Sequence, residues 1–327
     1  MLARLGHRVL AGLAVVLGVV ILTFVLLHAA PGDPVTHLLG PSATPEQIAM
    51  QREALGLDRP LAAQFATWVS RFARGDWGRS IAQGLPVRQL LATAWPATVR
   101  LVGLSLLLSY LIGVAVGALQ AARSGSRSDT ALSVASVTLF AVPGYWLGLM
   151  LVLVFTYWAR WLPAFGAAGL DSDYLSGGGW SGLVDRARHL ALPLATLTLI
   201  GIGGAARFVR GAMIETLSQP FITTARAKGL TSRQVIVRHA LRNALTPVVT
   251  LLGMSLPALF SGAVFVEAVF AWPGVGRVLV EAVQARDYPV VMAATAISAV
   301  LVVAGNMLAD VLAGWLDPRV RAASPTT

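Results

Sequence analysis

The chain has 327 residues and the composition of a membrane protein: 56% of the residues are hydrophobic, 12% are charged and the mean hydropathy is +0.71. A soluble domain carries about 25% charged residues, so an ordinary soluble globular fold is excluded. The absence of cysteine excludes disulfides and thiolate metal sites, whereas a net charge of +10 fits either nucleic-acid binding or membrane insertion until the charges are placed along the chain.

Six runs without Asp, Glu, Lys or Arg are long enough to cross a bilayer, which takes about 20 apolar residues. They predict six transmembrane helices, at residues 9–27, 101–122, 130–159, 190–206, 244–266 and 288–309. Three of these runs contain proline away from their ends, which a membrane helix tolerates where its neighbours satisfy the freed carbonyl groups. The third run, with Pro143 inside it, is expected to be one span.

The first run follows Arg4 and Arg8, so a secretory signal peptide is an alternative interpretation. The 19 residues of 9–27 exceed the 7–15 residues of a usual signal-peptide core, and Pro31 stands where cleavage would occur. An uncleaved membrane anchor is therefore the favoured interpretation.

The distribution of charge predicts the orientation. With the N-terminus inside, the cytoplasmic segments hold thirteen basic and four acidic residues, whereas the outer segments hold eleven of each. Cytoplasmic loops of membrane proteins carry an excess of Lys and Arg. The net positive charge is thus an insertion signal with both termini in the cytoplasm, and it calls for no nucleic-acid partner.

The first outer segment, residues 31–97, is predicted to form short helices that cap the bundle. Thr44-Pro45 is typical of a helix start, and Gly56 of a helix end. The next helix is expected to be amphipathic, with four apolar residues on one face: Leu61, Phe65, Trp68 and Phe72.

The predicted spans contain almost no ionisable or strongly polar side chains. Carriers coupled to protons or sodium need acids, histidines or broken-helix ion sites near the midplane. Here Asn306 is the one strong polar group inside a span, and an interhelical hydrogen bond is favoured over a substrate contact. Seven serines can line a pathway or serve as small packing residues: 105, 109, 133, 136, 255, 261 and 298. The pairs Gly113/Gly117 and Gly144/Gly148 allow close helix approach, within the chain or across a dimer.

A nucleotide-binding motif of the P-loop type is also absent from the sequence. A phosphate-binding P-loop needs Gly-Lys followed by Ser or Thr. The single lysine, Lys228, follows alanine and precedes Gly229-Leu230. Energy for active transport would therefore come from a partner protein.

The cytoplasmic loop, residues 207–243, is the most informative segment. Pro220 separates the end of one helix from a short helical stretch, Gly229 is suited to a left-handed helix end, and Thr231 or Ser232 caps a second helix. Two short helices joined at a glycine predict a rigid knob that projects from the membrane, with small residues at its tip: Thr223, Thr224, Ala225 and Ala227. The alternative is an ordinary basic loop obeying the positive-inside rule.

At this loop the sequence resembles the permease subunits of bacterial ABC importers, and within them the dipeptide/oligopeptide/nickel family, first-permease branch. The general pattern Glu-Ala-Ala, three residues, Gly, nine residues, hydrophobic-x-Leu-Pro is met by Gly229 and Leu241; Thr223-Thr224-Ala225 replace its first three residues, and Arg242 replaces the proline. The peptide branch is matched by TARAKGL at 224–230 and RHALRNA at 238–244. Further matches are HAAPGDP at 28–34, GLDRP at 56–60, residues 266–286 and LDPR at 316–319.

The resemblance implies an all-α membrane protein with the type I ABC transporter permease fold. Its expected regions are residues 1–94 (first helix and outer segment), 95–316 (permease domain) and a tail at 317–327. It implies the following partners: a second homologous permease in a heterodimer, two cytosolic ATPases that bind ATP and Mg²⁺, an extracytoplasmic substrate-binding protein and the bilayer of the bacterial inner membrane. It assigns coupling to the ATPase to these residues: Thr223, Thr224, Ala225, Arg226, Ala227, Lys228, Gly229, Leu230, His239 and Leu241.

Two other functional classes remain as alternatives to this non-catalytic permease: a secondary carrier or channel, and a membrane-embedded enzyme or assembly factor. Within the permease interpretation the substrate is expected to be a di- or oligopeptide. Nickel chelates and glutathione are the alternatives that share this scaffold.

Overall fold

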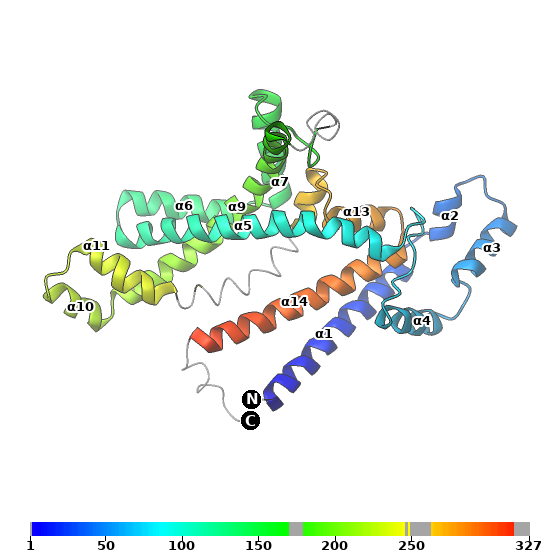
Figure 1. The fold of residues 1–327 in the computed structure, drawn as a ribbon, viewed down its shortest axis with the longest axis horizontal. Helices are drawn as coiled ribbons and strands as arrows, with labels where there is room; N and C mark the ends of the chain where they lie inside the picture. Colours follow the sequence, from blue (N-terminus) through cyan, green and yellow to red (C-terminus); the bar gives the residue numbers. More distant parts are fainter. Residues whose placement is uncertain (1, 170–178, 246–247, 249–262, 317–327) are drawn as a thin grey trace. The chain divides into compact units, whose positions relative to one another are not determined.

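The computed structural model describes residues 2–169, 179–245, 248 and 263–316. These residues are mainly helical (Figure 1), and the β pairing found among them is an isolated bridge between Arg79 and Pro86. The chain divides into two compact units. Unit 1 comprises residues 1–98 and 273–303, and unit 2 comprises residues 99–272 and 304–327.

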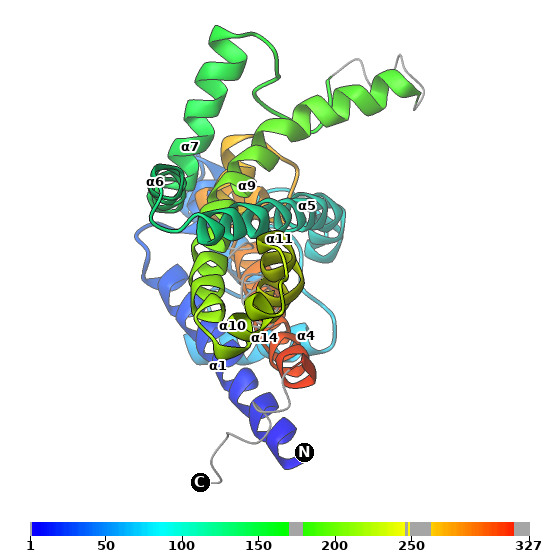
Figure 2. The same ribbon diagram turned by 90° about the vertical axis from the view of Figure 1, so that its left-hand side faces the viewer.

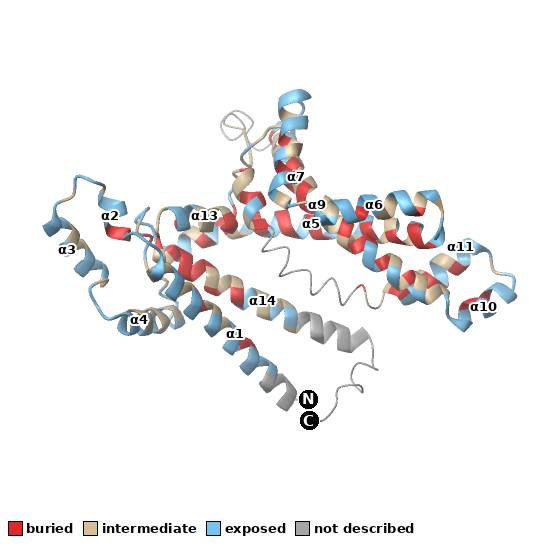
Figure 3. Ribbon diagram, turned by 180° about the vertical axis from the view of Figure 1, so that it is seen from behind, coloured by how far each residue is buried: buried red, intermediate tan, exposed pale blue. Residues whose placement is uncertain are grey.

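Unit 1 is built on two helices that lie side by side, α1 (Leu2–Ala29) and the first part of α14 (Tyr288–Leu316). Their contact is close, because a Cβ atom built on Gly12 would lie 2.5 Å from Cγ1 of Val303. Nearer the other end of α1, Val20 is buried in one cluster with Met292 and Ala296. Much of the rest of α1 is exposed (Figure 3), as expected of an apolar helix that faces lipid.

Three short helices follow α1: α2 (Pro34–Leu39), α3 (Pro45–Leu55) and α4 (Leu61–Ala73). The predicted boundaries of α3 are confirmed, since Thr44 and Gln47 form a reciprocal capping box and Gly56 adopts a left-handed conformation with φ of +69°. In α4 the predicted apolar face packs against the α1/α14 cluster through Phe65, Trp68 and Phe72, whereas Leu61 on the same face stays 53% exposed.

A buried carboxylate fixes the loop between α4 and α5 to the start of α14. Asp287 is 2% exposed. It accepts hydrogen bonds from the Ser80 hydroxyl and from the backbone N–H groups of Ile81 (3.0 Å) and Ala82 (3.2 Å). Beside it, α13 (Val275–Gln284) and the start of α5 (Val87–Ala122) share an apolar core with α14.

Unit 2 contains the rest of α5, α6 (Arg127–Ala141), α7 (Gly144–Leu151), the π-helix η1 (Val152–Trp158) and the long α9 (Trp180–Leu217). Both glycine pairs face partners inside this unit. A Cβ atom on Gly117 would lie 2.5 Å from the carbonyl oxygen of Ala206, and one on Gly148 would lie 3.0 Å from the Phe270 ring. The small residues therefore serve packing within the chain.

The third predicted span is not one continuous helix. α6 and α7 with η1 are bent by 105° at Val142-Pro143, so the expectation of a single helix over 130–159 is wrong. Proline has no N–H and disfavours helical geometry in the residue before it, and Val142 is indeed extended, with ψ of 131°. Pro193 lies inside the continuous α9, as predicted for a tolerated proline.

Four helices among the described residues are long and apolar enough to cross a membrane: Arg8–Ala29, Val87–Ala122, Trp180–Leu217 and Tyr288–Met307. The bent pair Arg127–Ala141 and Gly144–Trp158 makes a fifth candidate if it counts as one span. The predicted run 244–266 and the predicted tail 317–327 lie mostly or wholly outside the described residues. The count of six therefore stays a prediction.

Candidate coupling surface

The segment after α9 folds into a helix pair, as predicted. α10 (Pro220–Ala227) begins with proline at its first turn. α11 (Ser232–Gln234) continues into the π-helix η2 (Val235–Leu241). The two helices lie beside each other at the end of α9 in both ribbon views (Figures 1 and 2).

Gly229 ends α10 through a left-handed conformation, with φ of +77°. The Gly229 N–H donates to the carbonyl of Arg226 (3.0 Å), and the Leu230 N–H donates to the carbonyl of Ala225 (3.4 Å). This pair of bonds is the Schellman arrangement, which satisfies carbonyl groups left open at a helix end. The predicted role of glycine at this position is confirmed.

Of the two residues predicted to cap the second helix, Thr231 is the one that does so. Its hydroxyl accepts from the backbone N–H of Gln234, and the Gln234 side chain accepts from the backbone N–H of Thr231 (2.9 Å). Only one residue, Leu230, separates the glycine from this reciprocal cap. The turn between the helices is therefore defined at both ends.

The inner face of the helix pair is packed onto α9 and α5. Ile222, Val235 and Ala240 are between 0 and 1% exposed. They form one cluster with residues of α9 and the end of α5, including Val209, Met213 and Ala121. Burial of apolar surface stabilises the pair by roughly 25 cal/mol per Å². The knob is thus a rigid extension of the membrane helices.

The outer face carries most of the residues assigned to coupling. Those that are exposed are Thr223, Thr224, Arg226, Ala227, Lys228 and Gly229, and those that are half-buried are Leu230, His239 and Leu241. Ala225 is different, because it is only 5% exposed and packs inside the cluster. The expectation that Ala225 lies on the exposed tip is wrong, since it faces inward one turn after Ile222.

An ion pair that the sequence did not reveal joins α9 to α6. Arg210 of α9 donates from Nε and Nη2 to the two carboxylate oxygens of Asp129 at the start of α6, both at 2.8 Å. The carboxylate also accepts from Gly125 N–H (3.0 Å) and from the Ser133 hydroxyl (3.3 Å). No local sequence pattern indicates the pairing, because the two residues are 81 positions apart and the sequence shows each only as an isolated charged residue.

Several serines predicted within the spans form hydrogen bonds within the chain, whereas Ser255 and Ser261 lie outside the described residues. Ser109 donates to the carbonyl of Thr198 (3.1 Å), and Ser136 donates to the carbonyl of Leu132 (2.8 Å) and accepts from Gln120. Asn306 is exposed and has no side-chain hydrogen bond among the described residues, so the interhelical bond favoured for it is not found there. Within that part of the chain no cluster of three or more His, Asp or Glu residues is arranged to hold a metal.

Several helices of the described residues are long and apolar enough to span a membrane, and one of them, α9, is followed by a rigid helix pair; together they define a polytopic helical membrane protein. Residues 113–322 match the family of binding-protein-dependent transport system inner membrane components, and residues 1–102 match the N-terminal part of the corresponding membrane components. The chain belongs to this family, which confirms the resemblance seen in the sequence.

Relatives match over nearly their whole length. The oligopeptide transport system permease protein AppB of Bacillus subtilis is 38% identical over 98% of this chain and 99% of its own. The probable D,D-dipeptide transport system permease protein DdpB of Escherichia coli is 38% identical over 94% of each chain. The dipeptide transport system permease protein DppB of the same species is 35% identical over 93% of this chain and 94% of its own.

A solved structure supports the fold. A crystal structure of an amino acid ABC transporter with histidines aligns with a TM-score of 0.51 at 14% identity, over 68% of this chain and 92% of that chain. At this level of identity the similarity concerns the arrangement of helices alone.

Proposed function

We propose that this chain is a transmembrane permease subunit of an ATP-driven importer for short peptides. In this role it pairs with a second, homologous permease and receives peptide from an extracytoplasmic binding protein. It has six transmembrane helices, both termini in the cytoplasm of a bacterial cell, and no catalytic residue of its own. ATP and Mg²⁺ are bound by two separate cytosolic ATPases.

The observation that carries the proposal is the rigid helix pair around Gly229, on a chain that is 38% identical to an oligopeptide permease over nearly its full length. ATP-driven transport requires a mechanical link between the ATPases and the helices that enclose the pathway. The inner face of the pair shares one core with α9 and α5, so a displacement of the knob displaces both helices. In this proposal the helix bundle has two conformations, and the nucleotide state of the ATPases shifts the equilibrium between them.

The exposed face of the pair suits a protein partner. Its small residues allow close approach, and Arg226 and Lys228 add positive charge that favours an acidic cleft on the ATPase. Gly229 has open space around it, because a Cβ atom built there meets nothing within 4 Å. A bulky side chain at this position would therefore protrude from the surface toward the partner.

Replacement of Gly229 by tryptophan tests the proposal. Gly229→Trp is expected to lower peptide uptake and peptide-stimulated ATP hydrolysis of the reconstituted complex at least ten-fold, with membrane insertion retained. The matched control is Gly84→Trp, because Gly84 also has a left-handed φ (+68°) and open space, but lies in the loop before α5. Normal coupled uptake by the Gly229→Trp complex would contradict the assignment.

A further inference from the structure

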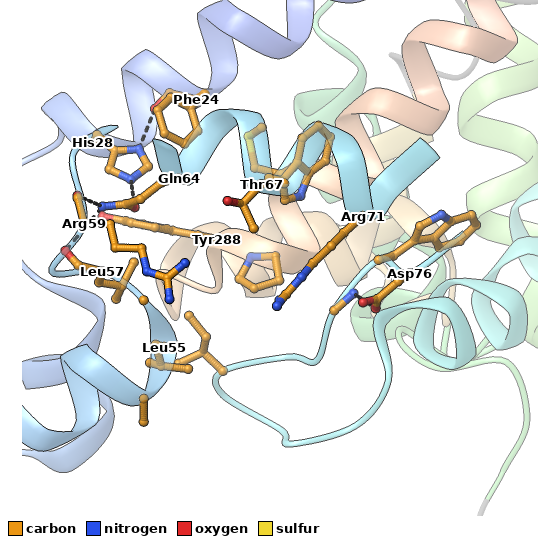
Figure 4. Close-up of a pocket in the computed structure, with 18 of the residues that line it drawn as sticks. Phe24, His28, Leu55, Leu57, Arg59, Gln64, Thr67, Arg71, Asp76 and Tyr288 are labelled. Atoms are coloured by element: carbon orange, nitrogen blue, oxygen red, sulfur yellow. Dashed lines mark hydrogen bonds between the residues drawn. The ribbon is translucent and has the colours of Figure 1, made fainter. Parts of the chain in front are cut away.

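A pocket of about 260 Å³ lies within unit 1, where α1, α3, α4 and α14 meet. It is lined by Phe24 and His28 at the end of α1, by residues from Glu53 to Gly78, and by Tyr288, Pro289 and Met292 of α14. This volume is slightly below the roughly 300 Å³ at which pockets for drug-sized ligands begin. It therefore suits a smaller ligand, of one or two residues. We call it the aromatic pocket (Figure 4).

Aromatic rings form its apolar walls and are fixed by contacts with one another. The rings of Phe24 and His28 lie 4.1 Å apart, and those of His28 and Tyr288 lie 5.1 Å apart. Trp68 and Trp77 also line the pocket, and both are in ring contact with Phe72. Such walls favour an apolar side chain.

Several hydrogen-bond donors that line the pocket have no acceptor among the described residues. Arg59 and Arg71 both line it, and neither guanidinium has a hydrogen-bond or ion-pair partner in the described part of the chain. Figure 4 shows the two side chains extending into the same space. The indole N–H of Trp68 is buried and likewise meets no acceptor there. A carboxylate would satisfy these donors, since guanidinium groups bind it through paired hydrogen bonds.

The position of Arg59 is held by a neighbouring network. The Gln64 side chain donates to the carbonyls of Leu57 (3.3 Å) and Arg59 (2.8 Å) and so orients its amide oxygen toward Nε2 of His28, at 3.3 Å. Nδ1 of His28 lies 2.8 Å from the carbonyl of Phe24. The turn that carries Arg59 is thereby fixed to the end of α1.

Acidic groups complete the lining. Glu53 and Asp76 also border the pocket, so its two guanidinium groups are balanced by two carboxylates. A balanced set of this kind matches a zwitterion, with a carboxylate and an ammonium group, better than it matches a phosphate dianion.

We propose that the aromatic pocket binds a short zwitterionic peptide, with the peptide carboxylate at Arg59 and Arg71 and an apolar side chain among Trp68, Trp77 and Tyr288. Nothing in the similarity to other permeases assigns this site. The inference takes its ligand class from the proposed function and adds a binding site to it.

Tryptophan fluorescence of the full-length chain in lipid nanodiscs tests the site directly. Titration with L-alanyl-L-leucine is expected to give a saturable change, which is reduced in Trp68→Phe, and the C-terminal amide of the same peptide is expected to bind at least ten-fold more weakly. Arg59→Gln and Arg71→Gln are each expected to weaken binding about ten-fold. Arg74→Gln is the matched control, because Arg74 ends the same helix and is exposed outside the pocket.

Several results would contradict the proposal that the aromatic pocket binds a zwitterionic peptide. These are equal binding of acid and amide, unchanged binding by Arg59→Gln and Arg71→Gln, an equal loss in Arg74→Gln, or a signal that appears only with anionic phospholipid. The comparison of acid with amide uses the unmodified chain and so holds even where a variant fails to fold. Uptake separates the two proposals: peptide uptake without pocket binding contradicts the site alone, and pocket binding without uptake by the assembled complex contradicts the proposed function alone.

Discussion

Arg210 and Asp129 form a bidentate ion pair that fixes α9 to the start of α6, with both N···O distances at 2.8 Å. The Asp129 side chain is 4% exposed and the Arg210 side chain 32%. The pair lies on the same stretch of α9 as Val209 and Met213, which pack against the helix pair around Gly229. The pair therefore fixes the part of α9 against which the helix pair around Gly229 packs.

Loss of this pair should destabilise the protein. Asp129→Asn leaves the guanidinium without its charge partner, and we expect a cost on the order of 2 kcal/mol, since one group is partly exposed. Arg210→Lys keeps the charge and loses the bidentate geometry, so its cost should be smaller. Thermal unfolding of the purified chain measures both. Arg52→Lys, in an exposed pair with Asp33, is the control and should change stability by less than about 0.5 kcal/mol; an equal effect there would contradict the argument.

Gly32 is required mainly for its backbone conformation. Its φ is +108°, and a Cβ atom there would lie 2.6 Å from Cζ of Arg286. Gly32→Ala should therefore cost more than Gly84→Ala, which introduces a Cβ atom at a left-handed position with open space; strain of this kind costs about 1–3 kcal/mol. Adding Arg286→Ala should change the cost of Gly32→Ala little, because the guanidinium is the flexible end of its side chain and can move aside, whereas the backbone strain stays. Equal effects of the two glycine substitutions in thermal unfolding would contradict the argument that the backbone at Gly32, with φ of +108°, is more strained than at Gly84, with φ of +68°.

Close packing of α5 on α9 should depend on Gly117. Gly117→Val would place side-chain atoms against the backbone of Ala206 and is expected to abolish stable folding or lower the unfolding temperature strongly. Gly103→Ala on the same helix is the control, because its Cβ atom meets nothing within 4 Å and alanine favours a helix by up to about 1 kcal/mol. A tolerated valine at 117 would mean that the two helices are not in close contact.

The proposed orientation can be mapped by single cysteine substitutions without first removing native thiols, because the chain contains no cysteine. A single introduced thiol is then its only reactive thiol group. Ala49→Cys on α3 should react with a membrane-impermeant maleimide in cells whose outer barrier is opened, whereas Thr223→Cys should react only after the inner membrane is lysed. Both positions are exposed in the structure. Labelling of Thr223→Cys in unlysed cells would reverse the assigned orientation.

Features set by neighbouring residues were predictable from the sequence. Thr44 and Gly56 bound α3, and Thr231 and Gly229 define the turn of the helix pair, because caps and left-handed glycines act within one helical turn. The different effects of two prolines were not predicted: Pro143 breaks its helix and Pro193 does not. The local difference is Gly144, which follows Pro143, since a Pro-Gly pair favours a turn.

Features set by distant residues were not predictable. Asp129 meets Arg210, and Gly32 meets Arg286, across 81 and 254 positions of sequence, and nothing local marks either residue as a partner. The burial of Ala225 followed the same rule, because its face is decided by packing against α9. The aromatic pocket likewise gathers segments that the sequence shows only as short helices and turns.

The most direct test of the account is a crosslink from the proposed coupling surface. A photo-reactive reagent on Lys228→Cys should form an adduct with an ATPase subunit in the assembled complex, because Lys228 is exposed at the end of α10. The same reagent on Ala49→Cys should form none. An adduct with the ATPase from position 49, or its absence at position 228 in a complex that still hydrolyses ATP, would contradict the docking of this chain through the helix pair around Gly229.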